Sequence, residues 1–384
     1  MRFIHTSDWH LGRLFHGKHL TDDQAYVLEQ FQALVKDTKP DAIIIAGDIY
    51  DRSVPPTEAV ELLDDTLAKL LLDEKVPIMM IAGNHDSPER VGFGSKLLAR
   101  QGLHVVGTLE KNVQPIVFQD TFGDVYFMPF TYAEPALVRH LFQLDKLDSH
   151  ELAMQFLVEQ SLANIPAKAR KVAIAHTFIA GSMESESERP LSVGGTSNVS
   201  SSVFAPFHYT ALGHLHNSQR AGAEHIRYSG SLLKYSFDEA NHKKGINIVE
   251  LDAAGNAKIE VVSLTPKYDV RVVEGHFNDI LKNRIDYPLS DDYISVKLLD
   301  TMPILDVHGQ LEKVYKNLLQ IERPYLTVAG KLQKPSGDHR RMSETELFDS
   351  FFEQMTGEKL TEVQSKVFRE NLDELFQAER EAKV

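Results

Sequence analysis

The side chains of this chain that could carry out chemistry stand in short motifs, each placed directly after an apolar stretch. These motifs hold carboxylate, amide and imidazole groups, and they are Asp8-Trp9-His10, Gly47-Asp48, Gly83-Asn84-His85-Asp86, His176 and Gly213-His214-Leu215-His216. Taken singly, each motif has an ordinary explanation as a polar turn, a helix-capping loop or a buried core histidine. Taken together, five consecutive strand ends carrying only such groups are improbable in a merely structural protein, because open α/β sheets bind ligands at the carboxyl ends of their strands. The motifs therefore predict a metal site.

The predicted ligand set is rich enough for two cations rather than one. It combines carboxylates, an amide oxygen and imidazoles, from Asp8, His10, Asp48, Asn84, His176, His214 and His216. A carboxylate shared between the cations would suit this set, and the mixture of nitrogen and oxygen ligands favours manganese, iron or zinc over magnesium or calcium. The chain has no cysteine, which excludes thiolate ligands and disulfides. His214 and His216 stand two residues apart on a segment expected to be extended, which would direct both imidazoles to the same side.

Alternating strands and helices in the first part of the chain would position these motifs. Apolar runs predict strands at residues 2–6, 41–46, 76–82, 171–175 and 209–212, each leading into one of the motifs. Helices are expected at residues 21–35, 58–72, 91–100 and 150–163, with Thr21 as the N-cap of the first. A hairpin is expected from residues 113–118 and 125–130, with further strands at 226–229, 245–251 and 257–263. This order is typical of an α/β fold with a largely buried sheet.

The pattern restarts after Pro266 as a small α/β module. Its expected elements are strands at residues 268–274, 293–299 and 325–328 and helices at 277–284 and 307–318. Two capping boxes, Ser343-Glu344-Thr345-Glu346 and Thr361-Glu362-Val363-Gln364, then predict two amphipathic helices. These helices either fold back on their own protein as a hairpin or dock onto the helices of a partner. The predicted domains are residues 1–265 and 266–330, followed by a linker at 331–342 and terminal helices at 343–384.

The composition limits the class of protein only loosely. At 384 residues the chain is long enough for two domains and an appendage. Its formal net charge of −14 argues against a generally basic nucleic-acid-binding surface. It does not exclude a DNA-processing enzyme, because bound divalent cations neutralise acidic ligands locally. No apolar run has the length of a membrane span and the first residues lack the features of a signal peptide, so we expect a cytoplasmic location.

The ordered set of motifs resembles the signature of the calcineurin-like metallophosphoesterases. Residues 5–12, with the sequence His5-Thr6-Ser7-Asp8-Trp9-His10-Leu11-Gly12, and residues 211–216 further resemble the DNA-repair nuclease branch of that family. The resemblance covers essentially the whole chain. It implies an α/β metallophosphoesterase β-sandwich flanked by helices, a small α/β capping domain and a C-terminal helical hairpin. Asp51 departs from archaeal and eukaryotic relatives, which tend to carry a histidine after the Gly-Asp motif.

Carried onto this sequence, the resemblance implies two manganese ions per subunit that share Asp48. The ligands of one ion would be Asp8, His10, Asp48 and His216. The ligands of the other would be Asp48, Asn84, His176 and His214. His85 would be the catalytic general acid at the leaving 3′-oxygen, with Asp86 orienting its ring. His16 either approaches the substrate or is an ordinary surface histidine.

The function implied by the resemblance is that of a manganese-dependent DNA nuclease in DNA repair, recombination and replication. It would be a 3′→5′ exonuclease on duplex DNA and an endonuclease on single strands that opens DNA hairpins. Its partner would be a coiled-coil ATPase subunit, gripped at the base of the coiled coil by the helices at residues 343–377. A homodimer within a heterotetramer is also implied.

Two other functions stay open. A small-molecule phosphatase or cyclic-nucleotide phosphodiesterase would share the metal ligands but would not need the capping domain or the helical tail. A non-catalytic scaffold would hold metal only structurally, and the intact Asp48 and His85 argue against it. The Ser-, Glu- and Gly-rich segment at residues 181–202 is either a flexible surface loop or a loop that contacts substrate.

Overall fold

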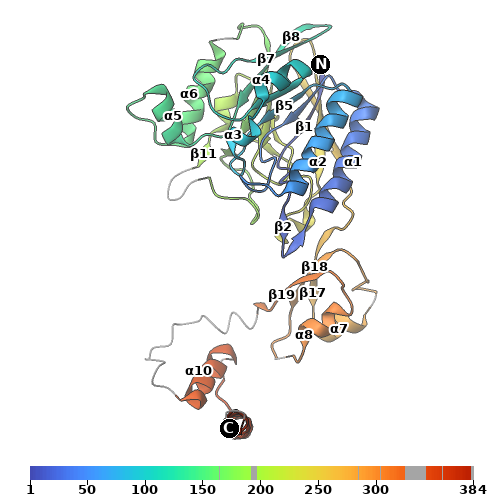
Figure 1. Cartoon of the computed structure of the whole chain (residues 1–384), viewed down its shortest axis with the longest axis vertical. Helices are drawn as coiled ribbons and strands as arrows, with labels where there is room; N and C mark the ends of the chain where they lie inside the picture. Colours follow the sequence, from blue (N-terminus) through green and yellow to red (C-terminus); the bar gives the residue numbers. More distant parts are fainter. Residues whose placement is uncertain are drawn as a thin grey trace. The chain divides into compact units, whose positions relative to one another are not determined.

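The computed structural model describes residues 1–163, 165–191, 197–283, 285–302, 304–324, 343–356 and 358–381. The chain forms two compact units, Met1–Val270 and Arg271–Val384 (Figure 1). The first unit contains every motif that was expected to bind metal.

The first unit is built on two six-stranded sheets. In the first sheet the strand order is β16-β15-β1-β4-β5-β6. Its strands are β1 (Arg2–Thr6), β4 (Ala42–Ile45), β5 (Ile78–Ile81), β6 (Leu103–Val106), β15 (Gly245–Leu251) and β16 (Ala257–Ser263). β1, β4, β5 and β6 are parallel, whereas β15 runs antiparallel to both of its neighbours. The carboxyl ends of β1, β4 and β5 therefore meet at one edge of the sheet.

The second sheet has the strand order β13-β14-β12-β9-β8-β7. Its strands are β7 (Ile116–Asp120), β8 (Gly123–Phe130), β9 (Arg170–His176), β12 (Tyr209–Gly213), β13 (Gln219–Ala221) and β14 (Ala223–Tyr228). The four central strands are parallel and the outer two are antiparallel to their neighbours. Two short ladders complete the unit, β2 (Leu14–Phe15) with β3 (Lys18–His19) and β10 (Phe178–Ile179) with β11 (Asn198–Val199).

The two sheets pack face to face around a shared apolar core. Phe3, Ile44 and Ile81 of the first sheet belong to one buried cluster with Phe127 and Ile174 of the second. The rings of Phe3 and Phe127 meet edge to face with their centroids 5.5 Å apart, a favourable aromatic geometry. Every residue of β4 and β5 is buried, as expected for strands covered on both faces.

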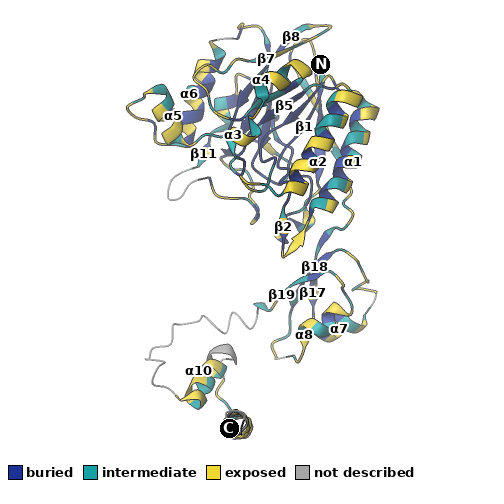
Figure 2. Ribbon diagram, viewed as in Figure 1, coloured by how far each residue is buried: buried dark blue, intermediate teal, exposed yellow. Residues whose placement is uncertain are grey.

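Helices flank the sandwich. α1 (Thr21–Thr38) and α2 (Thr57–Ala68) lie side by side next to the first sheet (Figure 1). α5 (Pro135–Phe142) and α6 (His150–Leu162) cover the second sheet, where Val138 and Leu157 share a buried cluster with Phe130 and Leu212. Colouring by burial shows dark-blue strands inside and exposed residues on the outer faces of the helices (Figure 2). The expected β-sandwich flanked by helices is confirmed.

Some local expectations were wrong. α1 begins at Thr21, and Leu20 occupies its N-cap position without a side-chain hydrogen bond, so Thr21 is not the cap. The helix expected at residues 91–100 is a series of short turns, namely α3 (Pro88–Val91), α4 (Ser95–Leu98) and η2 (Ala99–Gln101). Gly94 separates the first two with φ of +73°, a left-handed angle that ends a helix. β6 and β13 were not expected, and a π-helical turn, η1 (Lys69–Asp73), follows α2.

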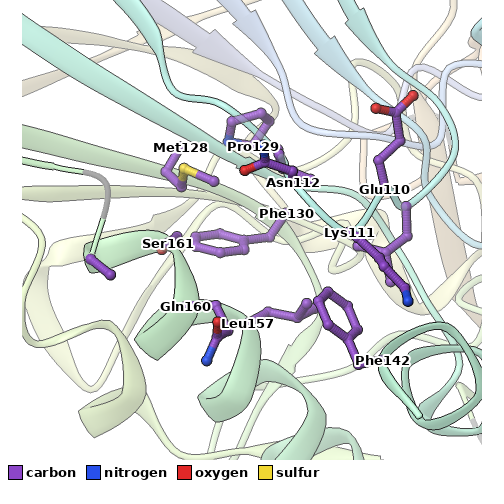
Figure 3. A pocket seen from close by; sticks show the side chains of 13 residues that line it. Glu110, Lys111, Asn112, Met128, Pro129, Phe130, Phe142, Leu157, Gln160 and Ser161 are labelled. Carbon is purple, nitrogen blue, oxygen red and sulfur yellow. The ribbon is translucent and has the colours of Figure 1, made fainter.

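A cavity of about 260 Å³ lies between α6, β8 and the segment before β7. Phe130, Phe142 and Leu157 supply apolar walls, and Lys111 and Gln160 add polar groups (Figure 3). None of the residues that line it belongs to a metal-binding motif.

The second unit contains a three-stranded sheet in the order β17-β18-β19. Its elements are β17 (Val270–Gly275), α7 (Phe277–Lys282), β18 (Tyr293–Leu298), α8 (Val307–Glu312) and β19 (Leu318–Glu322). Phe277 and Ile280 of α7 and Leu311 of α8 are buried together with Ile294 and Val296 of β18. The helix expected at residues 307–318 ends at Glu312, and Leu318 begins a strand instead. The strand expected at 325–328 and the linker expected at 331–342 lie outside the described residues.

Two helices, α10 (Glu344–Thr356) and α11 (Glu362–Glu381), follow in the same unit. The Ser343 N–H donates to Glu346 Oε2 at 2.8 Å and the Glu346 N–H donates to Ser343 Oγ at 3.3 Å. Thr361 and Gln364 make the same reciprocal pair, so both predicted capping boxes are confirmed. No helix in the described parts of the chain has the length and apolar character needed to cross a membrane.

Candidate metal centre

The residues predicted to bind metal converge at the carboxyl ends of five strands drawn from both sheets. They follow β1 (Asp8, His10), β4 (Asp48), β5 (Asn84), β9 (His176) and β12 (His214, His216). All are buried except Asn84, which is half-buried. β1, β4 and β5 are parallel in one sheet and β9 and β12 are parallel in the other. All seven predicted ligands therefore come together.

The backbone is strained at four of the ligand positions. The φ angle is +52° at Asp8, +45° at His10, +48° at Asp48 and +107° at His214. Such angles cost on the order of 1–3 kcal/mol each for residues other than glycine. Neighbouring segments hold the chain in place, since the Asp8 N–H donates to the Gly47 carbonyl at 3.0 Å and the His10 N–H donates to the Asp48 carbonyl at 3.0 Å. Strain that the surrounding structure enforces in this way clusters at functional sites.

Glycine precedes three of the predicted ligands because the strand ends approach too closely for a side chain. A Cβ atom at Gly47 would lie 2.4 Å from His176 Nδ1. A Cβ atom at Gly83 would lie 2.1 Å from Asp48 Oδ1. A Cβ atom at Gly213 would lie 2.0 Å from the carbonyl oxygen of Ala46. Real atoms do not approach so closely, so these glycines let the motifs after β5 and β12 reach the end of β4.

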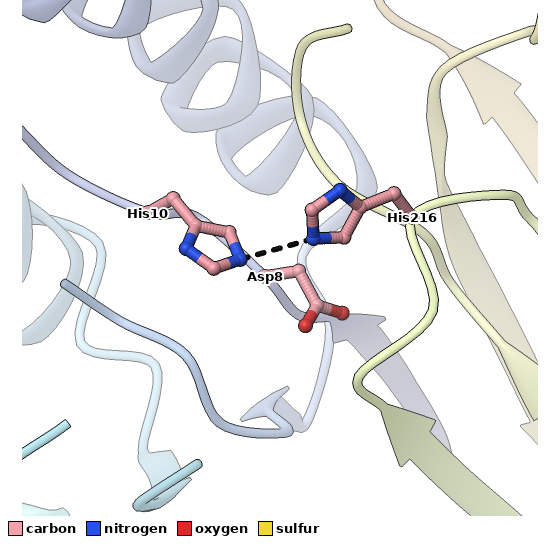
Figure 4. A group of neighbouring side chains, drawn as sticks. All are labelled: Asp8, His10 and His216. Atoms are coloured by element: carbon pink, nitrogen blue, oxygen red, sulfur yellow. Dashed lines mark hydrogen bonds between the residues drawn. The ribbon is translucent and has the colours of Figure 1, made fainter. Parts of the chain in front are cut away.

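Asp8, His10 and His216 form one group of ligand atoms (Figure 4). One ligand atom of each lies within 4.8 Å of the others. His10 Nε2 lies 3.0 Å from His216 Nε2 and 3.6 Å from Asp48 Oδ2. The side chains expected to hold one cation are thus in contact.

Asn84, His176 and His214 form a second group, which also approaches Asp48. Asn84 Oδ1 lies 2.9 Å from His176 Nε2 and 3.3 Å from His214 Nδ1. His176 Nε2 lies 3.5 Å from Asp48 Oδ2, the same oxygen that approaches His10. One oxygen of Asp48 is therefore close to an imidazole of each group.

His214 and His216 point to different groups, contrary to the expectation from their spacing. His214 approaches Asn84, whereas His216 approaches His10. The segment is not extended, because β12 ends at Gly213 and the backbone of His214 has φ of +107°. The alternation of side chains along a strand does not hold there.

Burial and neighbouring charges act on the ionisation of the ligands in opposite directions. Burial raises the pKa of Asp8 to about 8. Burial would also raise the pKa of Asp48, but the charge of His176 outweighs it and holds that pKa well below its usual range. Burial would lower the pKa of His176, yet the Asp48 carboxylate raises it to about 9. A proton on His176 is therefore the nearest counter-charge that the protein itself offers to these carboxylates.

The donor set fits divalent cations. His176 Nδ1 lies 2.9 Å from the carbonyl oxygen of Ala46, which can only accept, so this nitrogen carries the proton and Nε2 faces the ligand group. Asn84 presents its oxygen to both imidazoles of its group. Among the described residues, no Lys or Arg forms an ion pair with Asp8 or Asp48. Cations would supply the missing positive charge and accept the imidazole lone pairs.

His85 lies beside the ligands without joining either group in the predicted set. Its ring centroid is 4.7 Å from that of His10. The backbone N–H of His85 donates to Asp48 Oδ1 at 2.9 Å. His85 Nδ1 lies 2.8 Å from the carbonyl oxygen of Asp51 and therefore donates to it. Asp51 also accepts a hydrogen bond from Arg13 at 2.7 Å. The orientation of His85 thus depends on Asp51.

The role expected for Asp86 in orienting His85 was wrong. Its carboxylate accepts hydrogen bonds from three backbone N–H groups, those of Ile49, Tyr50 and Gly83, at 2.9–3.1 Å. Asp86 therefore fastens the segment after β4 to the segment after β5.

Several polar residues around His216 were not found from the sequence. They are Ser187, Glu188, Glu239 and Lys244, and all contact His216 directly or through one another. Ser187 and Glu188 lie in the segment at 181–202, of which residues 192–196 are not described. Ser185 and Ser187 are buried, so the described part is more than a solvated loop. His16 is exposed on the turn between β2 and β3, beside the rings of Phe15 and Phe237.

Comparison with known proteins defines the class to which this fold and site belong. Residues 1–218 match the family described as calcineurin-like phosphoesterase, and residues 266–356 match the type 5 capsule protein repressor C-terminal domain. The chain belongs to the calcineurin-like phosphoesterase family.

Its relatives within that family are more specific. Over 365 residues the chain is 33% identical to the D subunit of the nuclease SbcCD from Staphylococcus epidermidis, covering 95% of this chain and 96% of that protein. It is also 33% identical over 368 residues to the protein of the same name from Staphylococcus saprophyticus, with the same coverage. The resemblance found in the motifs is confirmed over nearly the whole chain. A solved dimetal phosphatase from Danio rerio aligns with 69% of this chain and 98% of that chain at 13% identity and a TM-score of 0.43, too low to bear on function.

Proposed function

We propose that this chain is the metal-dependent nuclease subunit of an SbcCD-type complex and hydrolyses phosphodiester bonds in DNA. One observation carries the proposal: two groups of imidazole, amide and carboxylate ligands meet at a single oxygen of Asp48. Relatives that match 95% of the chain are named as a nuclease subunit, which supports DNA as the substrate.

Two manganese ions per subunit are the proposed cofactors. Asp8, His10, Asp48 and His216 would bind one. Asp48, Asn84, His176 and His214 would bind the other. When bound, the cations would activate water as a nucleophile and stabilise negative charge on the phosphodiester. The imidazole-rich donor set favours manganese, iron or zinc over magnesium and calcium.

His85 is the proposed proton donor to the leaving 3′-oxygen. Its Nδ1 is fixed by the Asp51 carbonyl, which leaves the Nε2 edge available for a substrate oxygen. Its backbone N–H is fixed by Asp48. With its ring held at Nδ1 and its backbone held at N–H, His85 can act on the substrate without a large reorganisation.

The terminal helices are the proposed docking element for an SbcC-type coiled-coil ATPase. The rings of Phe348 on α10 and Phe368 on α11 stack with centroids 3.8 Å apart. Phe351, Val363 and Val367 remain 51–74% exposed, which leaves apolar surface for the helices of a partner. In this proposal residues 1–265 hydrolyse DNA, residues 266–330 form a capping domain and residues 331–342 link it to the helices.

A homodimer within a heterotetramer is proposed to place two centres on one DNA duplex. Exposed apolar side chains on helices of the first unit support such an interface, namely Val60 on α2, Phe93 after α3 and Leu97 on α4. The proposed activities are 3′→5′ exonuclease action on duplex DNA and endonuclease action on single strands that opens hairpins. The proposed setting is DNA repair, recombination and replication in the cytoplasm.

The alternative is a phosphatase or phosphodiesterase for small molecules, which the same ligands would serve. The deciding experiment gives the purified chain, with and without its ATPase partner, linear duplex DNA, hairpin DNA and bis-p-nitrophenyl phosphate in Mn²⁺ and in Mg²⁺. We expect cleavage of both DNA substrates in Mn²⁺ when the partner is present. Cleavage of the small ester alone under every condition would overturn the nuclease proposal.

A further inference from the structure

The imidazole of His216 is held by a chain of hydrogen bonds that ends in the protein interior. His216 Nδ1 lies 2.6 Å from Ser187 Oγ, which lies 2.5 Å from Glu239 Oε1. His216 and Glu239 are no more than 1% exposed. The chain of bonds joins the ligand to two segments far from it in sequence.

The direction of these bonds follows from the chemistry of the groups. Ser187 has one hydroxyl proton, and it donates that proton to Glu239, whose carboxylate can only accept. Ser187 Oγ must then accept from His216, so Nδ1 of His216 carries a proton. The other ring nitrogen, Nε2, is left with its lone pair facing His10. The chain of bonds therefore selects the tautomer that a cation requires.

Glu239 is itself held with its hydrogen-bonding capacity filled. Lys244 Nζ donates to Glu239 Oε2 at 2.5 Å and supplies a buried counter-charge. Ser236 Oγ and the Tyr235 N–H also donate to Glu239 Oε1, at 2.9 and 3.3 Å. A buried carboxylate satisfied in this way makes a rigid acceptor for Ser187.

The main chain of His216 is fixed by the same surroundings. The His216 N–H donates to Glu188 Oε1 at 2.6 Å, and the His216 carbonyl accepts from Lys244 Nζ at 2.7 Å. The segment that contains Ser187 and Glu188 is also held at Met183, whose N–H donates to Gln219 Oε1 at 2.9 Å. Both the ring and the backbone of this ligand are held by residues outside the metal-binding motifs.

We propose that Ser187 and Glu239, with Lys244 as counter-ion, are positioning residues that fix the tautomer and direction of His216 for the cation bound with Asp8 and His10. The proposal rests on the proposed function in so far as that function requires the cation. It gives residues 183–188 a role in building the centre rather than in touching substrate. In the other ligand group, the main-chain carbonyl of Ala46 accepts from Nδ1 of His176, as Ser187 does from Nδ1 of His216.

The test uses Ser187→Ala, Ser187→Thr and Glu239→Gln in the full-length chain, with Glu184→Gln as the control. Glu184 is an exposed residue of the same segment. Mn²⁺ alone is titrated calorimetrically into the metal-free proteins. We expect Ser187→Ala and Glu239→Gln to weaken one class of Mn²⁺ site by about 10–100-fold, as other changes to partners of ligand histidines do. Ser187→Thr keeps the hydroxyl and should restore the affinity, and Glu184→Gln should match the wild type.

A second measurement separates positioning from a general loss of structure. The Mn²⁺ concentration that half-activates hydrolysis of bis-p-nitrophenyl phosphate should rise in Ser187→Ala, while the rate at saturating Mn²⁺ stays near that of the wild type. Glu239→Gln leaves Lys244 buried without its counter-ion and should lower the melting temperature as well, so Ser187→Ala is the decisive variant. Wild-type Mn²⁺ affinity at both sites in Ser187→Ala would overturn the proposal. Normal Mn²⁺ binding without DNA cleavage by the wild-type chain would instead count against the proposed function alone.

Discussion

Strand β9 has a contact between charged groups at each end. At one end protein side chains of opposite charge pair fully with each other, and at the other end they do not. At its amino end Arg170 donates to both carboxylate oxygens of Asp120, at 2.6 and 2.8 Å. At its carboxyl end His176 lies 3.5 Å from Asp48, with Asp8 close by. The first contact is a bidentate pair between two groups that are both charged at pH 7. The second brings two buried carboxyl groups beside one imidazole, with no Lys or Arg ion pair among the described residues.

The difference separates a stabilising contact from a binding site. The ion pair between Asp120 and Arg170 joins β7 to β9, and it requires no bound ligand. Asp8 and Asp48 are held at strained backbone angles, and no Lys or Arg ion pair reaches them within the described residues. Proteins retain such arrangements where a ligand supplies what is missing. Variants at the ligand end of β9 and at its Arg170 end test this contrast.

Asp48→Asn should have the largest effect, because one oxygen of Asp48 approaches both ligand groups. We expect hydrolysis of bis-p-nitrophenyl phosphate in Mn²⁺ to fall by at least about 10³-fold, since the loss of one electrostatic contact to a transition state already costs about 10²–10³-fold. The metal-free protein should stay folded, because asparagine can still accept a hydrogen bond from the backbone N–H of His85. Unchanged Mn²⁺ affinity in this variant would show that Asp48 is not the shared ligand.

His85→Gln should lower the rate by about 10²–10⁴-fold, the usual contribution of a general acid, and leave Mn²⁺ binding unchanged. The reason is that His85 contacts the ligands but is proposed to act on the leaving group. Calorimetric titration with Mn²⁺ and single-turnover cleavage of duplex DNA measure the two effects separately. Full nuclease activity in His85→Gln would remove the proton-donor role.

Asn84→Ala should weaken the binding of one cation by at least about 10-fold and leave the other unaffected, since even changes behind a ligand cost that much. Asn84 is the half-buried member of its group, and its Oδ1 lies within 3.3 Å of ring nitrogens of two imidazoles. Raising Mn²⁺ should recover part of the activity. Asn112→Ala, at an exposed position outside the motifs, is the control and should titrate like the wild type.

The sequence predicted which residues converge at this site, because their chemical types and their place after strands can both be read from it. The bounds of β1, β15 and β16 were also correct to the residue, since these strands are apolar or alternating runs with clear turns beside them. The family resemblance assigned His214 and His216 to different ions, but their spacing alone predicted the same side, because the separation depends on a left-handed angle at His214. The amino-acid types do not predict such an angle, because the surrounding structure alone enforces it.

The residues that hold the predicted ligands in position were the hardest to predict from the sequence. Ser187 and Glu239 are 52 residues apart, and each meets His216 only through the tertiary fold. Neither belongs to a motif, and a Ser- and Glu-rich segment is more often solvated than buried. Asp86 shows the converse error, because adjacency to His85 suggested a contact, whereas Asp86 binds three backbone N–H groups and the His85 ring binds the Asp51 carbonyl.

Asp120→Asn should have the smallest effect on activity and should act on stability instead. The hydrogen bonds from Arg170 hold the pKa of Asp120 well below its usual range. A carboxyl group with a depressed pKa in the folded state stabilises the fold above its unfolded pKa, which is about 3.9, and loses that contribution as the pH falls through the folded pKa. At pH 7 the variant should therefore be less stable than the wild type by on the order of 1–3 kcal/mol, the range for a hydrogen bond to a charged group.

The pH dependence of that difference is the sharper measurement. Urea unfolding of the metal-free wild type and Asp120→Asn should give a constant gap between about pH 5 and pH 7, and the gap should narrow below about pH 4 as the wild-type carboxylate takes up a proton. Hydrolysis in Mn²⁺ at pH 7 should be unchanged at temperatures where both proteins are folded, since Asp120 lies at the other end of β9 from the ligands. A loss of activity without a loss of stability would mean that the two ends of β9 are coupled, and the contrast between them would fail.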